Sequence, residues 1–243
     1  MRRRTIAVLC LAFLPAWAPA ARAGEAVDLE LVLAADGSGS IDEDELRVQR
    51  EGYAQAITSA TVLNAIRSGP HGAIALAYIE WGAPDSQHTV VDWTVIRDAA
   101  SAKAFADELL AMPRLARGYN SISGAIDYAA AKIRTNAYEG ARKIIDVSGD
   151  GPQIGGRPVQ AARDEAVIAG ITINALVVKR PGGGYPGPGG MPLLEHYERD
   201  VIGGFGAFVM TAGDRASFAD AIRNKMVEEL AGGRVAPEHP SIR

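Results

Sequence analysis

The residues with the clearest chemical potential form a short run, Asp36-Gly37-Ser38-Gly39-Ser40, directly after an apolar segment. Alternate residues of an extended turn point the same way, so Asp36, Ser38 and Ser40 can direct three oxygen atoms toward one point. Hard cations such as Mg²⁺ prefer oxygen ligands in octahedral geometry and usually keep some water. The run therefore predicts part of a divalent-cation site.

The elements that would position this run follow from six short, nearly continuous apolar segments. They cover 29–35, 74–79, 89–93, 143–147, 171–178 and 207–210. Such segments are typical of strands covered on both faces, as in a mostly parallel sheet. Helical spacing of apolar residues predicts helices around 46–57, 104–112, 122–133 and 218–230. The short gap after 74–79 favours a hairpin. We expect an α/β, doubly wound, mostly parallel sheet of about six strands, with one antiparallel edge strand and helices on both faces.

The run after a first buried strand resembles the metal-ion-dependent adhesion site of von Willebrand factor A (vWA) domains, which have a Rossmann-like α/β fold. That family completes its site with a Thr or Ser from a second loop and an Asp from a third. Segments 118–126 and 144–151 resemble those two loops. The resemblance implies a cation, Mg²⁺ or alternatively Mn²⁺ or Ca²⁺, with a set of five ligands. These are Asp36, Ser38, Ser40, Ser121 and Asp150.

The resemblance also extends to a DUF1194-like group of exported bacterial vWA-like proteins that share the Ser-Ile-Asp and Val-Ile-Gly-Gly segments. Ser121 stands where vWA domains usually have Thr, and losing the methyl group that restricts the rotamer predicts looser ligation. Ser123, two residues further on, is an alternative second-loop ligand.

Each of the three segments also has a purely structural interpretation. Ser40 and Glu43 match a capping box, Ser121 matches an N-cap, and Asp150-Gly151 matches a turn. A structural domain with a degenerate, empty metal site is therefore an alternative to a functional one.

The N-terminus has the pattern of a secretory signal peptide. Three arginines at positions 2–4 precede an apolar stretch that is too short to span a bilayer, and Ala21-Arg22-Ala23 supplies a cleavage pattern. We expect cleavage after Ala23 and a periplasmic or secreted protein whose mature chain has no integral membrane span. The mature chain is then a vWA-like domain over 24–231 followed by a disordered tail over 232–243.

Cleavage changes the chemistry that the chain can offer. It removes the one cysteine, Cys10, so neither a disulfide nor a thiolate is available to the mature protein. It also removes four arginines and no acidic residue, which makes the mature chain more acidic than the formal net charge of −4 of the full sequence. An acidic surface argues against binding to nucleic acid.

The expected function is adhesion-like protein binding without catalytic residues. A cation held by two carboxylates and neutral hydroxyls keeps an open position, which would attract an acidic group from a partner protein. A metal-dependent hydrolase is the alternative from another class, and it needs a general base near the metal. His196 and Glu195, which follow a Gly/Pro-rich loop at 181–190, are the candidates for that base. The sequence fixes neither the partner nor the oligomeric state.

Overall fold

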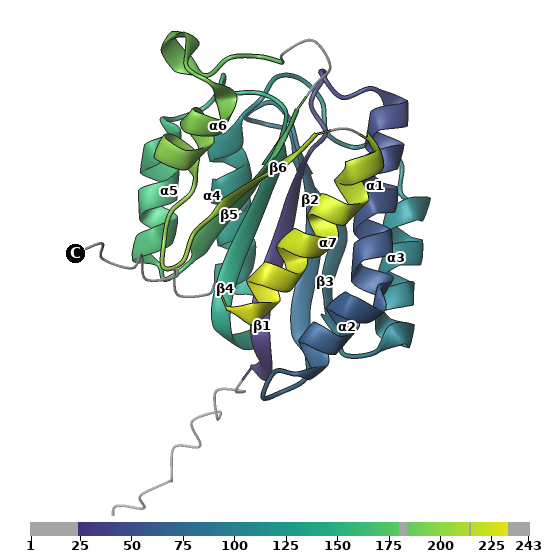
Figure 1. Ribbon diagram of the computed structural model, residues 1–243. Helices are drawn as coiled ribbons and strands as arrows, with labels where there is room; N and C mark the ends of the chain where they lie inside the picture. Colours follow the sequence, from purple (N-terminus) through teal and green to yellow (C-terminus); the bar gives the residue numbers. More distant parts are fainter. Residues whose placement is uncertain (1–23, 180–183, 214, 233–243) are drawn as a thin grey trace, which may run out of the picture.

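The computed structural model describes residues 24–179, 184–213 and 215–232 (Figure 1). The expected signal peptide (1–23) and all of the expected tail beyond Gly232 lie outside the described residues. In chain order the elements are β1 (Glu25–Asp36), α1 (Glu43–Thr58), α2 (Ala60–Arg67), β2 (Ile74–Trp81), β3 (Gln87–Ile96), α3 (Ala99–Ala111), α4 (Ile122–Thr135), β4 (Tyr138–Gly149), α5 (Val159–Ile168), β5 (Thr172–Val178), η1 (Pro188–Gly190), α6 (Leu193–His196), η2 (Tyr197–Val201), β6 (Val209–Ala212) and α7 (Arg215–Ala231).

The sheet has six strands in the order β3-β2-β1-β4-β5-β6, and the predicted architecture is confirmed. β3 pairs antiparallel with β2 at one edge, while the other neighbouring strands are parallel. β1 and β4 begin several residues earlier than their apolar segments. Their first residues pair with each other, for example Glu25 with Tyr138, where the sheet meets solvent and no apolar run is needed.

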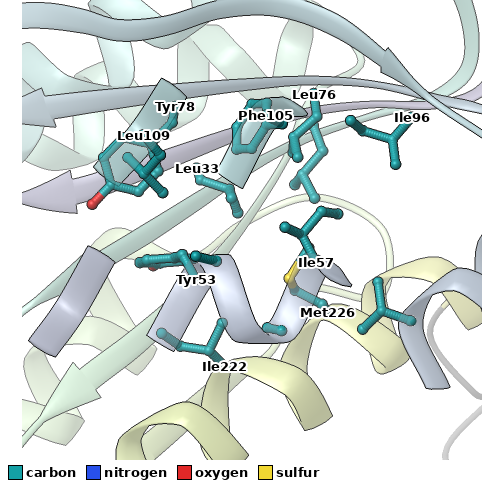
Figure 2. Close-up of a cluster of buried hydrophobic side chains, with 14 of the residues drawn as sticks. Leu33, Tyr53, Ile57, Leu76, Tyr78, Ile96, Phe105, Leu109, Ile222 and Met226 are labelled. Carbon is teal, nitrogen blue, oxygen red and sulfur yellow. The ribbon is translucent and has the colours of Figure 1, made fainter. Parts of the chain in front are cut away.

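Helices cover both faces of the sheet (Figure 1). α1, α2, α3 and α7 lie on one face, where their apolar side chains pack on the strands (Figure 2). α4, α5 and the α6–η2 segment lie on the other face. The sequence pattern did not single out α2 or α5, because both are short and α5 buries mainly the small residues Ala162 and Ala166. No helix in the described part of the chain has the length and apolarity needed to cross a membrane.

The carboxyl ends of the parallel strands lie together at the upper edge of the sheet in Figure 1. Ala35 of β1 is in register with Ser148 of β4, so the residues that follow these two strands leave the sheet side by side. The chain leaves β1 toward α1 on one face, and it leaves β4 toward α5 on the other face. This is the topological switch point where open α/β sheets bind ligands.

Candidate metal centre

The first loop, residues 36–42, starts with a carboxylate that is fully buried. Asp36 Oδ1 accepts a hydrogen bond from the Ser38 amide at 2.8 Å, and the Asp36 carbonyl accepts one from Gln49 Nε2 at 3.0 Å. Asp36 Oδ2 is also buried and has no hydrogen-bond partner among the described residues. A buried polar atom without a partner destabilises the folded state, so a cation or a proton bound at this oxygen would stabilise it.

Two serine hydroxyls connect the first loop to the third loop, residues 150–157. Ser38 Oγ and Ser40 Oγ are 3.0 Å apart, and Ser40 Oγ donates to Asp150 Oδ1 at 3.0 Å. The structure thus brings Asp36, Ser38, Ser40 and Asp150 together at the end of β1 and β4. All of them are buried except Ser40, which is partly exposed.

The capping-box interpretation of Ser40 and Glu43 is wrong. The N-cap of α1 is Asp42, whose carboxylate accepts from the Glu45 amide at 2.7 Å, while the Glu45 side chain accepts from the Asp42 amide. Because the helix is capped two residues later than that interpretation placed it, the hydroxyl of Ser40 is directed to Asp150 instead.

Burial, together with the negative charge of Asp150, raises the pKa of Asp36 from 3.8 to about 7. Hydrogen bonds from Ser38 and from the Asp150 backbone lower the pKa of Asp36, but they offset its burial only in part. None of the ion pairs formed by the described residues involves Asp36. An acid in this situation is stabilised by taking up a proton or by a cation at its free oxygen.

The second loop, residues 117–121, leads into α4. Ser121 is fully buried and is the N-cap of α4, where its Oγ accepts from the Gly124 amide at 3.2 Å. The N-cap interpretation is therefore confirmed, and Ser121 has no side-chain bond to Asp36. Its loop is nevertheless tied to the first loop, because the Gly39 amide donates to the Gly118 carbonyl at 2.8 Å.

Ser123, the alternative second-loop ligand, is engaged elsewhere. Its Oγ accepts from Gln153 Nε2 at 2.9 Å, and its amide donates to Gln153 Oε1 at 2.9 Å. Gln153 also donates to the carbonyl of Arg157 at 3.1 Å and so fixes the shape of the third loop. These two hydrogen bonds to Gln153 favour Ser121 over Ser123 as the second-loop member of the site.

The α6–η2 segment forms hydrogen bonds with the third loop. Tyr197 Oη donates to the Gly151 carbonyl at 3.0 Å, and His196 Nε2 accepts from the Gln153 amide at 3.3 Å. His196 Nδ1 is 2.8 Å from Asp200 Oδ2, and the ring is only 1% exposed. Burial, with the charges of Asp36 and Asp150 adding to it, raises the pKa of Tyr197 well above its usual value. Both ring nitrogens of His196, a candidate general base, are thus engaged, Nε2 by the third loop and Nδ1 by Asp200.

The sequence did not indicate a role for Gln153 or Tyr197, nor for Arg114, a further residue that contacts the first loop. No local pattern marks them, because each has partners that are distant along the chain, as Gln153 has in Ser123.

The donor set that results consists of oxygen atoms. Within the described residues no group of three or more His, Cys, Asp or Glu is arranged to hold a metal, so a site here depends on serine hydroxyls. Two buried carboxylates, one of them with an unpartnered oxygen, and three hydroxyls on adjoining loops fit a small hard cation better than a soft one.

Comparisons with solved structures find the same fold in adhesive and matrix proteins. Proximal thread matrix protein 1 of the mussel byssus superposes with a TM-score of 0.62 at 16% identity, over 87% of this chain and 49% of that one. The pilus adhesin SpaC of Lactobacillus rhamnosus GG gives 0.59 at 13%, over 84% and 30%. A von Willebrand factor type A protein of Catenulispora acidiphila gives 0.57 at 15%, over 84% and 43%.

This chain therefore spans half or less of the length of those three proteins. A further structure of the mussel protein, with a TM-score of 0.54 and 16% identity over 84% of this chain and 46% of that one, is described as having a zinc-occupied MIDAS motif. A search of curated proteins finds no match. The family model described as a protein of unknown function, DUF1194, matches residues 26–234. The chain thus belongs to the DUF1194 family, and its fold is that of a vWA domain.

Proposed function

We propose that this protein is an exported, divalent-cation-dependent protein-binding module. Asp36, Ser38, Ser40, Ser121 and Asp150 would hold the cation, with Mg²⁺ as the first choice. The observation that carries the proposal is the buried Asp36 oxygen without a partner, next to the Ser38–Ser40–Asp150 hydrogen-bond chain. When bound, the cation would supply an electrophilic position that an acidic group of a partner protein can occupy.

Exposed apolar side chains beside the cluster support a role in protein binding. Tyr119 is 75% exposed and Ile154 is 62% exposed, and they lie in the second and third loops. The Ile154 amide donates to the Asn120 carbonyl at 2.9 Å, so the two loops adjoin next to these residues. Exposed aromatic side chains such as that of Tyr119 are enriched in protein interfaces.

Calorimetric titration of the mature chain with Mg²⁺ and Mn²⁺ tests the metal site. We expect binding by the wild type, and loss of binding in Asp36→Ala and Asp150→Ala. Asp85→Ala is the matched control, because Asp85 is an exposed acid in the loop between β2 and β3. Unchanged affinity in both site variants would show that the assignment is wrong.

Ser121→Ala and Ser123→Ala separate the two candidates of the second loop. We expect Ser121→Ala to lower the cation affinity, and Ser123→Ala to leave it close to the wild-type value because that hydroxyl is bound to Gln153. The reverse result would move the ligand to Ser123.

Binding without catalysis is part of the proposal, and it is supported by the engagement of His196 with Gln153 and Asp200. A screen of phosphatase and esterase substrates with added Mn²⁺ tests it. Turnover that is lost in Asp36→Ala would replace the binding assignment with a hydrolase.

A pull-down from a periplasmic extract, with and without EDTA and with Asp36→Ala as a control, would identify the partner.

A further inference from the structure

Arg114, between α3 and α4, forms hydrogen bonds with the backbone of the first loop. Its Nη2 lies 3.0 Å from the carbonyl oxygen of Gly37, 2.7 Å from that of Ser38 and 2.6 Å from that of Ile41, so these three acceptors share its two N–H groups. Its Nη1 binds Glu43 at the start of α1 at 3.0 Å. Hydrogen bonds from a charged donor are stronger than neutral ones. One guanidinium therefore fixes three carbonyls of the loop that carries Asp36, Ser38 and Ser40.

Arg114 is itself positioned by a buried ion pair. Arg50 of α1 donates to the carbonyls of Met112 and Pro113, the two residues that precede Arg114. Arg50 pairs with Glu80 of β2 at 2.7 Å, and their side chains are 7% and 0% exposed. The backbone that presents Arg114 to the first loop is thus anchored in the core.

The first loop needs such support because two of its residues are glycines. Glycine loses more conformational freedom than other residues when a loop is fixed. At Gly37 a side chain is excluded, since an added Cβ would lie 2.9 Å from Ala116 Cβ. At Gly39 there is room, because the nearest atom to an added Cβ is the Gly118 carbonyl oxygen at 3.6 Å.

We propose that Arg114 is a positioning residue that holds the first loop in its cation-binding conformation before the cation arrives. The inference rests on the proposed metal site. It predicts an effect opposite in sign to that of simple electrostatics. Removing a positive charge from the neighbourhood of a cation site should strengthen cation binding, whereas removing a positioning residue should weaken it.

The test is the Mn²⁺ affinity of Arg114→Met, measured by calorimetry, with the thermal unfolding of each protein in EDTA recorded alongside. Arg142→Met is the matched control. Arg142 also donates to two backbone carbonyls, those of Glu229 at 2.5 Å and Leu230 at 2.9 Å, but at the end of α7. We expect Arg114→Met to bind Mn²⁺ about 10- to 100-fold more weakly, as is usual for outer-shell residues, and Arg142→Met to bind within about twofold of the wild type.

Two further variants keep the inference testable if Arg114→Met is poorly folded. Arg114→Lys retains the charge but not the planar fork of donors, so we expect weaker binding although the charge is unchanged. Gly39→Ala, combined with either Arg114 variant, restricts the free loop and should recover part of the lost affinity.

Unchanged or tighter Mn²⁺ binding by folded Arg114→Met or Arg114→Lys would overturn the inference, as would an equal loss in Arg142→Met. Wild-type protein that binds neither Mn²⁺ nor Mg²⁺ would instead refute the metal site itself, and the positioning role with it.

Discussion

Two pairs of buried carboxylates lie in this domain, and they are neutralised in different ways. In the interior, Asp146 of β4 and Glu229 of α7 share the ammonium group of Lys225, at 2.6 Å and 2.5 Å. At the edge of the sheet, Asp36 and Asp150 are connected through serine hydroxyls, and Asp36 has no ion-pair partner among the described residues. Each pair leaves a buried oxygen without a hydrogen-bond partner, Glu229 Oε2 in the interior and Asp36 Oδ2 at the edge, but among the described residues only the interior pair has a cationic side chain between its carboxylates.

The two clusters also differ in their surroundings. The interior cluster joins α7 to the sheet, and Asn174 Nδ2 of β5 completes it by donating to Glu229 Oε1 at 3.1 Å. Its side chains are buried, although Asn174 and Glu229 also line a pocket of about 220 Å³. The edge cluster stands at the switch point of the sheet, where loops rather than helices surround it.

Removing the internal cation should give the largest effect on stability. Lys225→Met would leave Asp146 and Glu229 as two buried acids without compensation, and breaking such a pair costs about 3–5 kcal/mol. Urea unfolding at pH 7.5 measures the loss. Lys103→Met is the control, because the exposed Lys103–Asp107 pair has the same spacing along a helix and the same 2.5 Å distance. We expect its effect to stay within about 1 kcal/mol. Equal effects would show that burial of the cluster is not what matters.

The internal cluster should also give the stability a pH dependence. Burial, with the charge of Asp146 adding to it, raises the pKa of Glu229 from 4.5 to about 7. Between these values the folded state binds more protons than the unfolded state, so the stability from this group falls as the pH rises from about 4.5 to 7. The shift corresponds to a loss of up to about 3 kcal/mol.

Urea unfolding of the metal-free protein between pH 5 and pH 8 tests this dependence against Glu229→Gln. We expect the wild type to lose more stability over this range than the variant. Asp36, whose pKa is also raised, contributes equally to both proteins and cancels in the difference. Parallel pH profiles would contradict the prediction.

An external cation should do for the edge cluster what Lys225 does in the interior. Mg²⁺ at about 100 times its dissociation constant would stabilise the folded state by about 2.7 kcal/mol, because it binds the folded state alone. For a domain of this size, that corresponds to several degrees in melting temperature. Thermal unfolding with Mg²⁺ and with EDTA measures the shift, and Asp150→Asn should abolish it. A shift of equal size in Asp150→Asn would place the binding of Mg²⁺ elsewhere.

The edge cluster was largely predictable from the sequence, and the interior one was not. Asp36, Ser38 and Ser40 form a local pattern after an apolar strand, and the parallel strand order brings Asp150 beside them. The cap of α1 was misplaced because Ser40–Glu43 and Asp42–Glu45 are overlapping capping-box patterns. Spacing alone does not distinguish them.

Lys225 and Glu229 had a weaker signal. They lie three and seven residues after Ile222, on the same side of α7 as the apolar stripe, where an exposed charge is not expected. Arg114 gave no signal, because its three carbonyl partners are more than 70 residues away along the chain. Contacts of this kind depend on the packing of the fold, which a local pattern does not contain.

The sharpest form of the comparison is a substitution whose effect should have opposite signs in the two clusters. Asp36→Asn keeps the acceptor for the Ser38 amide and removes a buried charge that has no internal cation. In EDTA at pH 8, we expect the variant to be more stable than the wild type, by roughly 1–2 kcal/mol, because replacing an uncompensated buried charge by a neutral isostere is stabilising. The same substitution should abolish stabilisation by Mg²⁺.

Asp146→Asn provides the contrast, because it would leave Lys225 with a single carboxylate and should destabilise the protein under the same conditions. Urea unfolding in EDTA compares both variants with the wild type. A loss of stability in Asp36→Asn would mean that the folded chain already compensates this carboxylate. The edge cluster would then be a second structural site, and the case for a cation there would have to rest on direct titration alone.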